Sequence, residues 1–143
     1  MDDGTLEIEF RRWESQQAPW ERADPIWSLV AYRLARYLLD AARADVGSYN
    51  TRVGFAARDQ LVQSVTSISA NIGEGHSRPT QRDRVRFYCY ALGSAREAVS
   101  WYTAVSDALP PGTVGARIAA LTRIRRLLLG LLRRRTNPTW RRR

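Results

Sequence analysis

The feature that most constrains this chain is the recurrence of apolar residues at helical spacing. The clearest case lies in the middle of the sequence, where Leu61, Val65, Ile68 and Ile72 follow one another at intervals of three or four residues. This spacing places all four side chains on one face of a helix. Similar patterns fill most of the chain from residue 24 to residue 135, and proline or glycine separates them. Such a chain buries its apolar residues by packing amphipathic helices against one another.

The breaks between the patterns predict four helices. Asp24 before Pro25 is typical of a helix start, and we expect the first helix over 24–44. We expect the others over about 51–74, 81–109 and 114–135, with Gly73 and Gly75 ending the second by adopting positive φ. Thr80 is expected to cap the third helix. Because the connections are short, the sequence predicts an all-α, antiparallel, up-down-up-down four-helix bundle.

The ends of the chain do not fit this pattern. Leu6, Ile8 and Phe10 alternate with polar residues, which predicts a short strand within a non-helical N-terminal arm over 1–23. The arm holds Trp13 and Trp20, and two alternatives remain open for it: disorder, or packing on another surface. We therefore divide the chain into an acidic arm (1–23), a helical bundle (24–135) and a basic tail (136–143).

The charge of the chain is strongly positive and unevenly distributed. The net charge is +9, and all 23 basic residues are arginine. Acidic residues concentrate in residues 1–24, whereas residues 117–143 contain arginine and no acid. Guanidinium groups bind phosphate and carboxylate through paired hydrogen bonds, so this asymmetry indicates an anionic partner.

The arginines near the C-terminus are the candidates for nucleic-acid contact, because acidic residues are missing from their part of the sequence. Trp140, which stands among them, could stack on a base. Since no sequence-reading motif is evident, binding should be directed at the phosphate backbone and should depend on salt. The candidates are Arg123, Arg126, Arg133, Arg134, Arg135, Trp140, Arg141, Arg142 and Arg143. Four arginines of the first and third helices are interpreted as a solvated face: Arg33, Arg36, Arg43 and Arg96.

The residue types that most enzymes and metal sites need are scarce. His76 and Cys89 are the single histidine and cysteine, so no His/Cys metal cluster can form. We expect His76 in an exposed loop, and Cys89 as a small residue filling space on a helix. We expect no enzymatic activity, no metal and no cofactor. The lone cysteine favours a reduced, cytoplasmic protein. The longest apolar run is too short for a membrane span.

The end of the second helix also carries a family resemblance. The pattern S-I-x-x-N-I-x-E-G-x-x-R over 67–78, followed by Arg86-Phe87, Ala91, Gly93-Ser94 and Glu97, resembles the four-helix-bundle family of the 23S rRNA intervening-sequence proteins. The resemblance covers roughly 24–135, although Ser69 stands where the family usually has proline. It implies a homopentamer. A more distant similarity to accessory proteins of diversity-generating retroelements implies a reverse transcriptase as a possible partner.

The polar residues of this motif allow two interpretations. They are Asn71, Glu74, Arg78, Arg86 and Glu97. In the favoured one, Asn71 binds free carbonyls while the acids pair with the arginines and fix the corner between the second and third helices. In the other, they form a ligand or partner site.

Three functions are compatible with these observations. The first is an oligomer that binds RNA or DNA electrostatically. The wide apolar face of the third helix and the tryptophans of the arm give the candidates for contact between copies: Tyr90, Trp101, Trp13 and Trp20. The second is a protein-binding adaptor without direct nucleic-acid contact. The third, binding to a membrane surface, ranks last because the bundle core needs the apolar face of the fourth helix.

Overall fold

The computed structural model describes residues 3–47 and 50–136, and these ranges contain helices and no strand. The elements are α1 (Asp3–Ser15), α2 (Pro19–Ala23), the 3-10 turn η1 (Pro25–Ser28), α3 (Val30–Asp45), α4 (Phe55–Ser77), α5 (Gln81–Ala104), the 3-10 turn η2 (Ser106–Ala108) and α6 (Thr113–Thr136). The prediction of an all-α chain is confirmed for these residues.

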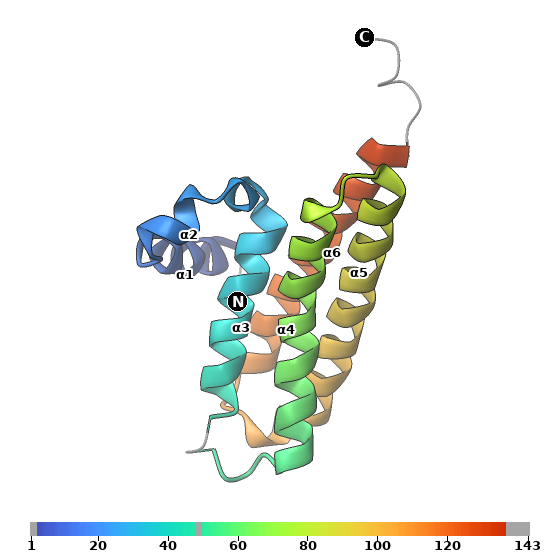
Figure 1. Ribbon diagram of the computed structural model, residues 1–143. Helices are drawn as coiled ribbons and strands as arrows, with labels where there is room; N and C mark the ends of the chain where they lie inside the picture. The colour runs from blue at the N-terminus through green and yellow to red at the C-terminus, as the bar shows by residue number, and fades with distance from the viewer. Residues whose placement is uncertain (1–2, 48–49, 137–143) are drawn as a thin grey trace.

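The long helices α3, α4, α5 and α6 lie side by side, and successive helices run in opposite directions (Figure 1). Alanines at 91, 95 and 98 give α5 a flat buried face, so α4 and α5 pack closely. Large side chains fill the rest of the core, and α1 with α2 lies to one side (Figure 1). The largest fully buried side chains include Leu34, Leu38, Leu61, Ile68, Ile72, Tyr88, Tyr102, Leu121, Ile124 and Leu128.

The prediction of a non-helical N-terminal arm is wrong. Residues 3–15 form α1, which contacts α3 and α6. Leu6 and Phe10, which are 2% and 3% exposed, belong to the core, whereas Ile8 is 63% exposed. Residues four apart share a helix face, so Leu6 and Phe10 point inward together while Ile8 points to solvent. Of the two alternatives for the arm, packing on another surface is the one observed, and that surface belongs to the same chain.

Several predicted boundaries also differ from those observed. Asp24 does act as a cap, since its carboxylate accepts a hydrogen bond from the Ile26 amide at 3.0 Å, but it caps η1 rather than α3. The third predicted helix ends at residue 104 rather than 109, and η2 follows it. Thr80 caps α5 as expected, accepting from the Asp83 amide at 3.2 Å. Thr136 belongs to α6, and the remaining predicted tail, 137–143, lies outside the described residues.

Gly73 and Gly75 do not end α4, contrary to the prediction. Both lie inside the helix, and Gly112 is the one described residue with positive φ. Gly75 is needed for close packing instead, because a Cβ there would lie 2.9 Å from Cε1 of Tyr88. The helix ends at Ser77, where Arg78 takes an extended conformation before Pro79.

Candidate nucleic-acid interface

Arg123 on α6 has an acidic partner that the local sequence does not supply. Its guanidinium donates to Glu7 of α1 at 2.8 Å and lies 5.9 Å from the centre of the Phe10 ring. Hydrogen bonds from Arg11 and Arg123 lower the pKa of Glu7. The fold brings α1 against α6 and so supplies Arg123 with an acid that its own part of the sequence lacks.

Arg126 and Arg134 remain without an ion pair among the described residues. Both are exposed and line a groove of about 320 Å³ between the start of α3 and the C-terminal half of α6. Apolar residues including Leu29, Leu127 and Leu131 complete its lining. The groove thus presents guanidinium groups beside an apolar floor.

The other C-terminal candidates are described less fully. Arg133 is exposed near the end of α6, and Arg135 belongs to the same helix. The predicted contacts of Trp140, Arg141, Arg142 and Arg143 lie outside the described residues.

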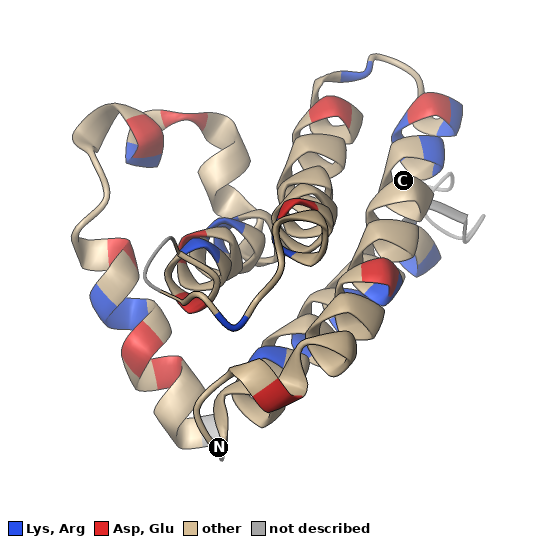
Figure 2. Cartoon of the chain, turned by 90° about the horizontal axis from the view of Figure 1, so that it is seen from below, with Lys and Arg blue, Asp and Glu red and all other residues tan. Residues whose placement is uncertain are grey.

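The acids of α1 and α2 serve to attach these helices to α3. Glu14 pairs with Arg33 at 2.5 Å, and Glu21 pairs with Arg36 at 3.0 Å. Figure 2 shows both red and blue residues on α1 and on α2. The interpretation of Arg33 and Arg36 as part of a solvated face is therefore wrong, because both are half-buried and paired with these acids.

Further hydrogen bonds complete this attachment. The Tyr37 hydroxyl donates to Glu9 at 2.9 Å. Burial and this bond raise the pKa of Tyr37 to about 12. The Trp13 indole donates to Asp40 at 2.8 Å and stacks on Phe10 and Trp27.

The polar residues of the helix corner are only partly brought together. Asn71 donates to the Ser67 carbonyl at 2.8 Å and to the Ser67 hydroxyl at 3.0 Å. The Ser67 hydroxyl also lies 2.8 Å from that of Ser94, so this group joins α4 to α5. Asn71 thus supports the Ser67–Ser94 contact between the helices, and it binds a carbonyl within α4 rather than a free one at the helix end.

Of the ion pairs predicted between the acids and the arginines of the corner, one is observed. Arg78 pairs with Glu74, and its guanidinium lies 4.8 Å from the centre of the Phe87 ring. Arg86 instead donates to the Tyr90 hydroxyl at 2.8 Å. Glu97 is exposed on α5, and no ion pair joins it to another described residue. The predicted pairing of Glu97 with Arg78 or Arg86 is wrong.

The candidates for contact between copies differ in exposure. Trp101 packs against the core, and Trp13 packs within the aromatic group described above. Trp20 and Tyr90 are 75% and 46% exposed. Cys89 is also exposed, so it does not fill space in the packing, whereas His76 is half-buried in the last turn of α4 rather than in a loop.

A buried ionic network at the opposite end of the helices was not predicted. Arg117 donates to both carboxylate oxygens of Asp45, at 2.7 and 2.9 Å, and the Tyr102 hydroxyl donates to the same group at 2.8 Å. These bonds raise the pKa of Arg117, while burial with the nearby carboxylate raises that of Tyr102. Asp45 and Arg117 are 72 positions apart, so no local sequence pattern indicates their pairing.

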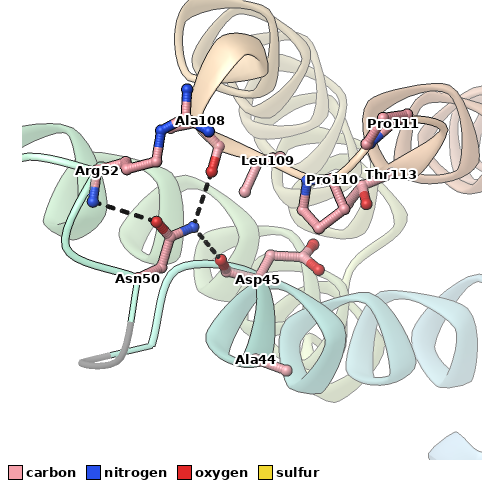
Figure 3. Close-up of a pocket in the computed structure, with 9 residues that line it drawn as sticks. All are labelled: Ala44, Asp45, Asn50, Arg52, Ala108, Leu109, Pro110, Pro111 and Thr113. Carbon is pink, nitrogen blue, oxygen red and sulfur yellow. Dashed lines mark hydrogen bonds between the residues drawn. The ribbon is translucent and has the colours of Figure 1, made fainter.

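A pocket of about 450 Å³ lies beside this network (Figure 3). Asn50 donates to the carbonyls of Asp45 and Ala108 at 3.1 and 3.0 Å, and Arg52 donates to the Asp107 carbonyl at 2.6 Å. These bonds tie the α3–α4 connection to the α5–α6 connection, which gives the polar residues here a structural role. Among the described residues, the pocket included, no group of three or more histidine, cysteine or acidic side chains is placed to hold a metal ion. No described helix is long and apolar enough to span a membrane.

Residues 29–109, more than half of the chain, match the family model of the 23S rRNA-intervening sequence protein. The chain belongs to this family. The match includes α3, α4 and α5, whereas α1, α2 and α6 lie outside it. The arginines of α6 are therefore features of this chain beyond the matched region.

A solved structure shows the same fold. It is a protein of unknown function of the S23 ribosomal protein family from Bacteroides thetaiotaomicron, with a TM-score of 0.61 and 21% sequence identity. The similarity covers 72% of this chain and 91% of the other. A search of curated proteins finds no match.

Proposed function

We propose that this member of the intervening-sequence protein family is a non-enzymatic, oligomeric, up-down-up-down four-helix bundle that binds nucleic acid through arginines. One observation carries the proposal: α6 has no acidic residue, and its Arg126 and Arg134 are exposed beside one groove without an ion pair in the described chain. Their backbones lie about 12 Å apart along the helix axis. That separation suits contact with two phosphates of one strand that are not direct neighbours. In an oligomer the same surface is repeated, and repeated weak contacts raise the overall affinity.

Binding of this kind is tested by its dependence on salt. We would measure the affinity for a labelled single-stranded RNA by fluorescence anisotropy, using the Arg126→Gln/Arg134→Gln double variant. Each lost phosphate contact lowers the slope of log affinity against log salt by about 0.7, so the double variant should lose about 1.4. The matched control is Arg43→Gln/Arg96→Gln, which removes the same charge from exposed positions on α3 and α5.

For the control variant, the slope of log affinity against log salt should stay closer to that of the unaltered protein. Equal slopes and affinities for the two double variants would contradict a role for the α6 arginines. Absence of RNA binding at every salt concentration would contradict the proposal as a whole.

A second candidate is a protein-binding adaptor, for which a reverse transcriptase remains a possible partner. It is favoured by Ile8 and Trp20, which are 63% and 75% exposed on helices that precede the family match. A protein that ignores RNA but loses a protein partner on Trp20→Ser would support this candidate.

A further inference from the structure

Arginine and aromatic side chains form a continuous group at the α4–α5 corner, which we call the arginine–aromatic strip. Its members are Arg78, Phe87, Tyr90 and Arg86. The Arg78 guanidinium lies 4.8 Å from the centre of the Phe87 ring, and the Phe87 and Tyr90 rings meet edge to face at 5.6 Å. The Arg86 guanidinium lies 5.6 Å from the centre of the Tyr90 ring. In space, the two aromatic rings of the strip therefore lie between its two guanidinium groups.

The backbone and neighbouring residues hold the strip in place. Arg84 donates to the Arg78 carbonyl at 2.5 Å, which fixes the connection to the first turn of α5. Gly75 lets α5 approach so closely that an added Cβ would lie 3.1 Å from Cβ of Phe87. The outer end of the strip is open to solvent, because Arg86 is exposed and Tyr90 is 46% exposed.

The surroundings of the strip are basic. Arg82 and Arg84 lie in the first turns of α5, where Asp83 is the one acid. The C-terminal end of α6, with Arg133 and Arg134, lies at the same end of the helices as the α4–α5 connection (Figure 1). Arg78 is paired with Glu74, whereas Arg82, Arg84 and Arg86 have no ion pair among the described residues. Two arginine groups that are distant in sequence thus meet at one end.

We propose that the arginine–aromatic strip binds unpaired bases of a nucleic-acid strand, while the arginines at this end contact its phosphates. The proposal rests on the proposed function and deepens it by assigning a site and the form of the ligand. An unpaired base has a flat face that stacks on tyrosine or on a guanidinium plane, and each stacked base contributes about 1–3 kcal/mol. Paired bases are already stacked in a duplex, so the strip favours single strands. A purely acidic peptide would pair with the arginines, but it has no flat group that could stack on the Tyr90 ring.

The decisive experiment separates bases from phosphates. We would measure binding of two labelled strands of equal length, one of thymidine nucleotides and one abasic, by anisotropy at fixed salt. The unaltered protein should bind the thymidine strand about tenfold more tightly, as one stacked base predicts. Tyr90→Ala should lose this preference yet still bind the abasic strand in a salt-dependent manner, whereas Tyr90→Phe should keep the preference because it keeps the ring.

The chain offers a matched control at the other end of the helices. Phe55, at the start of α4, is 81% exposed, and the Arg58 guanidinium lies 5.3 Å from the centre of its ring. Phe55→Ala removes a ring of the same kind from a less basic surface, so it should leave the preference for the thymidine strand unchanged. Equal effects of Phe55→Ala and Tyr90→Ala would contradict the site.

Other outcomes separate this inference from the proposed function. Equal, salt-dependent binding of both strands by the unaltered protein would overturn the inference and leave the proposed function standing. Failure to bind either strand would overturn both. A changed molecular mass of Tyr90→Ala in light scattering would assign Tyr90 to contact between copies and overturn its role in stacking.

Discussion

Gly75 shows how one residue sets the distance between two helices. A Cβ at this position would lie 2.9 and 3.0 Å from two ring atoms of Tyr88, and Tyr88 is fully buried. The ring has no free space to move into, so a methyl group must push α4 and α5 apart. Because Phe87 and Tyr90 stand on the same part of α5, the packing at Gly75 also positions the arginine–aromatic strip.

Gly75→Ala should therefore destabilise the protein even though alanine is the better helix former. Overpacking of this kind costs about 1–3 kcal/mol, which exceeds the gain in helix propensity of about 1 kcal/mol. The measurement is chemical denaturation followed by circular dichroism. Gly93→Ala on α5 is the matched control, since nothing lies within 4 Å of an added Cβ there, and it should be neutral or stabilising. A stabilising effect at both positions would contradict the close packing.

At the scale of elements, α1 is the helix whose attachment is most easily tested. Phe10 is buried and contacts Trp13 and Tyr37, whereas Ile8 on the same helix faces solvent. Phe10→Ala should lower the free energy of unfolding by about 3 kcal/mol or detach α1, which would expose Trp13 and shift its fluorescence to longer wavelength. Ile8→Ala should change the stability by less than about 0.5 kcal/mol. Equal small effects of the two substitutions would show that α1 is not docked.

The elements also show what the sequence could predict. The long helices were predictable because apolar residues recur over many turns. A pattern of that length fits the helical period of 3.6 residues and not the strand period of two. Leu6, Ile8 and Phe10 form a short pattern that fits a strand as well as a helix, since positions four apart share a face in both. Contacts between distant segments, such as Arg123 with Glu7, depend on how helices pack, and no local pattern encodes them.

The candidate site was predictable to a similar degree. The arginines of α6 were identified from charge alone, and the helix corner from its motif. The combination of Arg86 with Tyr90, and of Arg78 with Phe87, appears only once α4 and the first turns of α5 are placed in space. The sequence alone indicates contact between copies for Tyr90 and an ion pair for Arg86, whereas the fold joins the two residues by a hydrogen bond.

At the scale of the whole molecule, the distribution of charge is the property that links fold and function. The acids of α1 and α2 pair with Arg33, Arg36 and Arg123, so they neutralise one side of the helices. The C-terminal end of α6 and the α4–α5 corner lie at one end (Figure 1), and arginines outnumber acids there although Arg78 is paired with Glu74. An oligomer would repeat this end in every copy and would bind a polyanion with an affinity that falls steeply as salt rises.

The most direct test of this account is size-exclusion chromatography with light scattering, run on the protein alone and with a structured RNA that contains single-stranded loops, at low and at high salt. We expect a particle larger than one chain that co-elutes with the RNA at low salt and separates from it at high salt. An oligomer that ignores the RNA at both salt concentrations would contradict nucleic-acid binding, and a monomer would contradict the oligomeric scaffold.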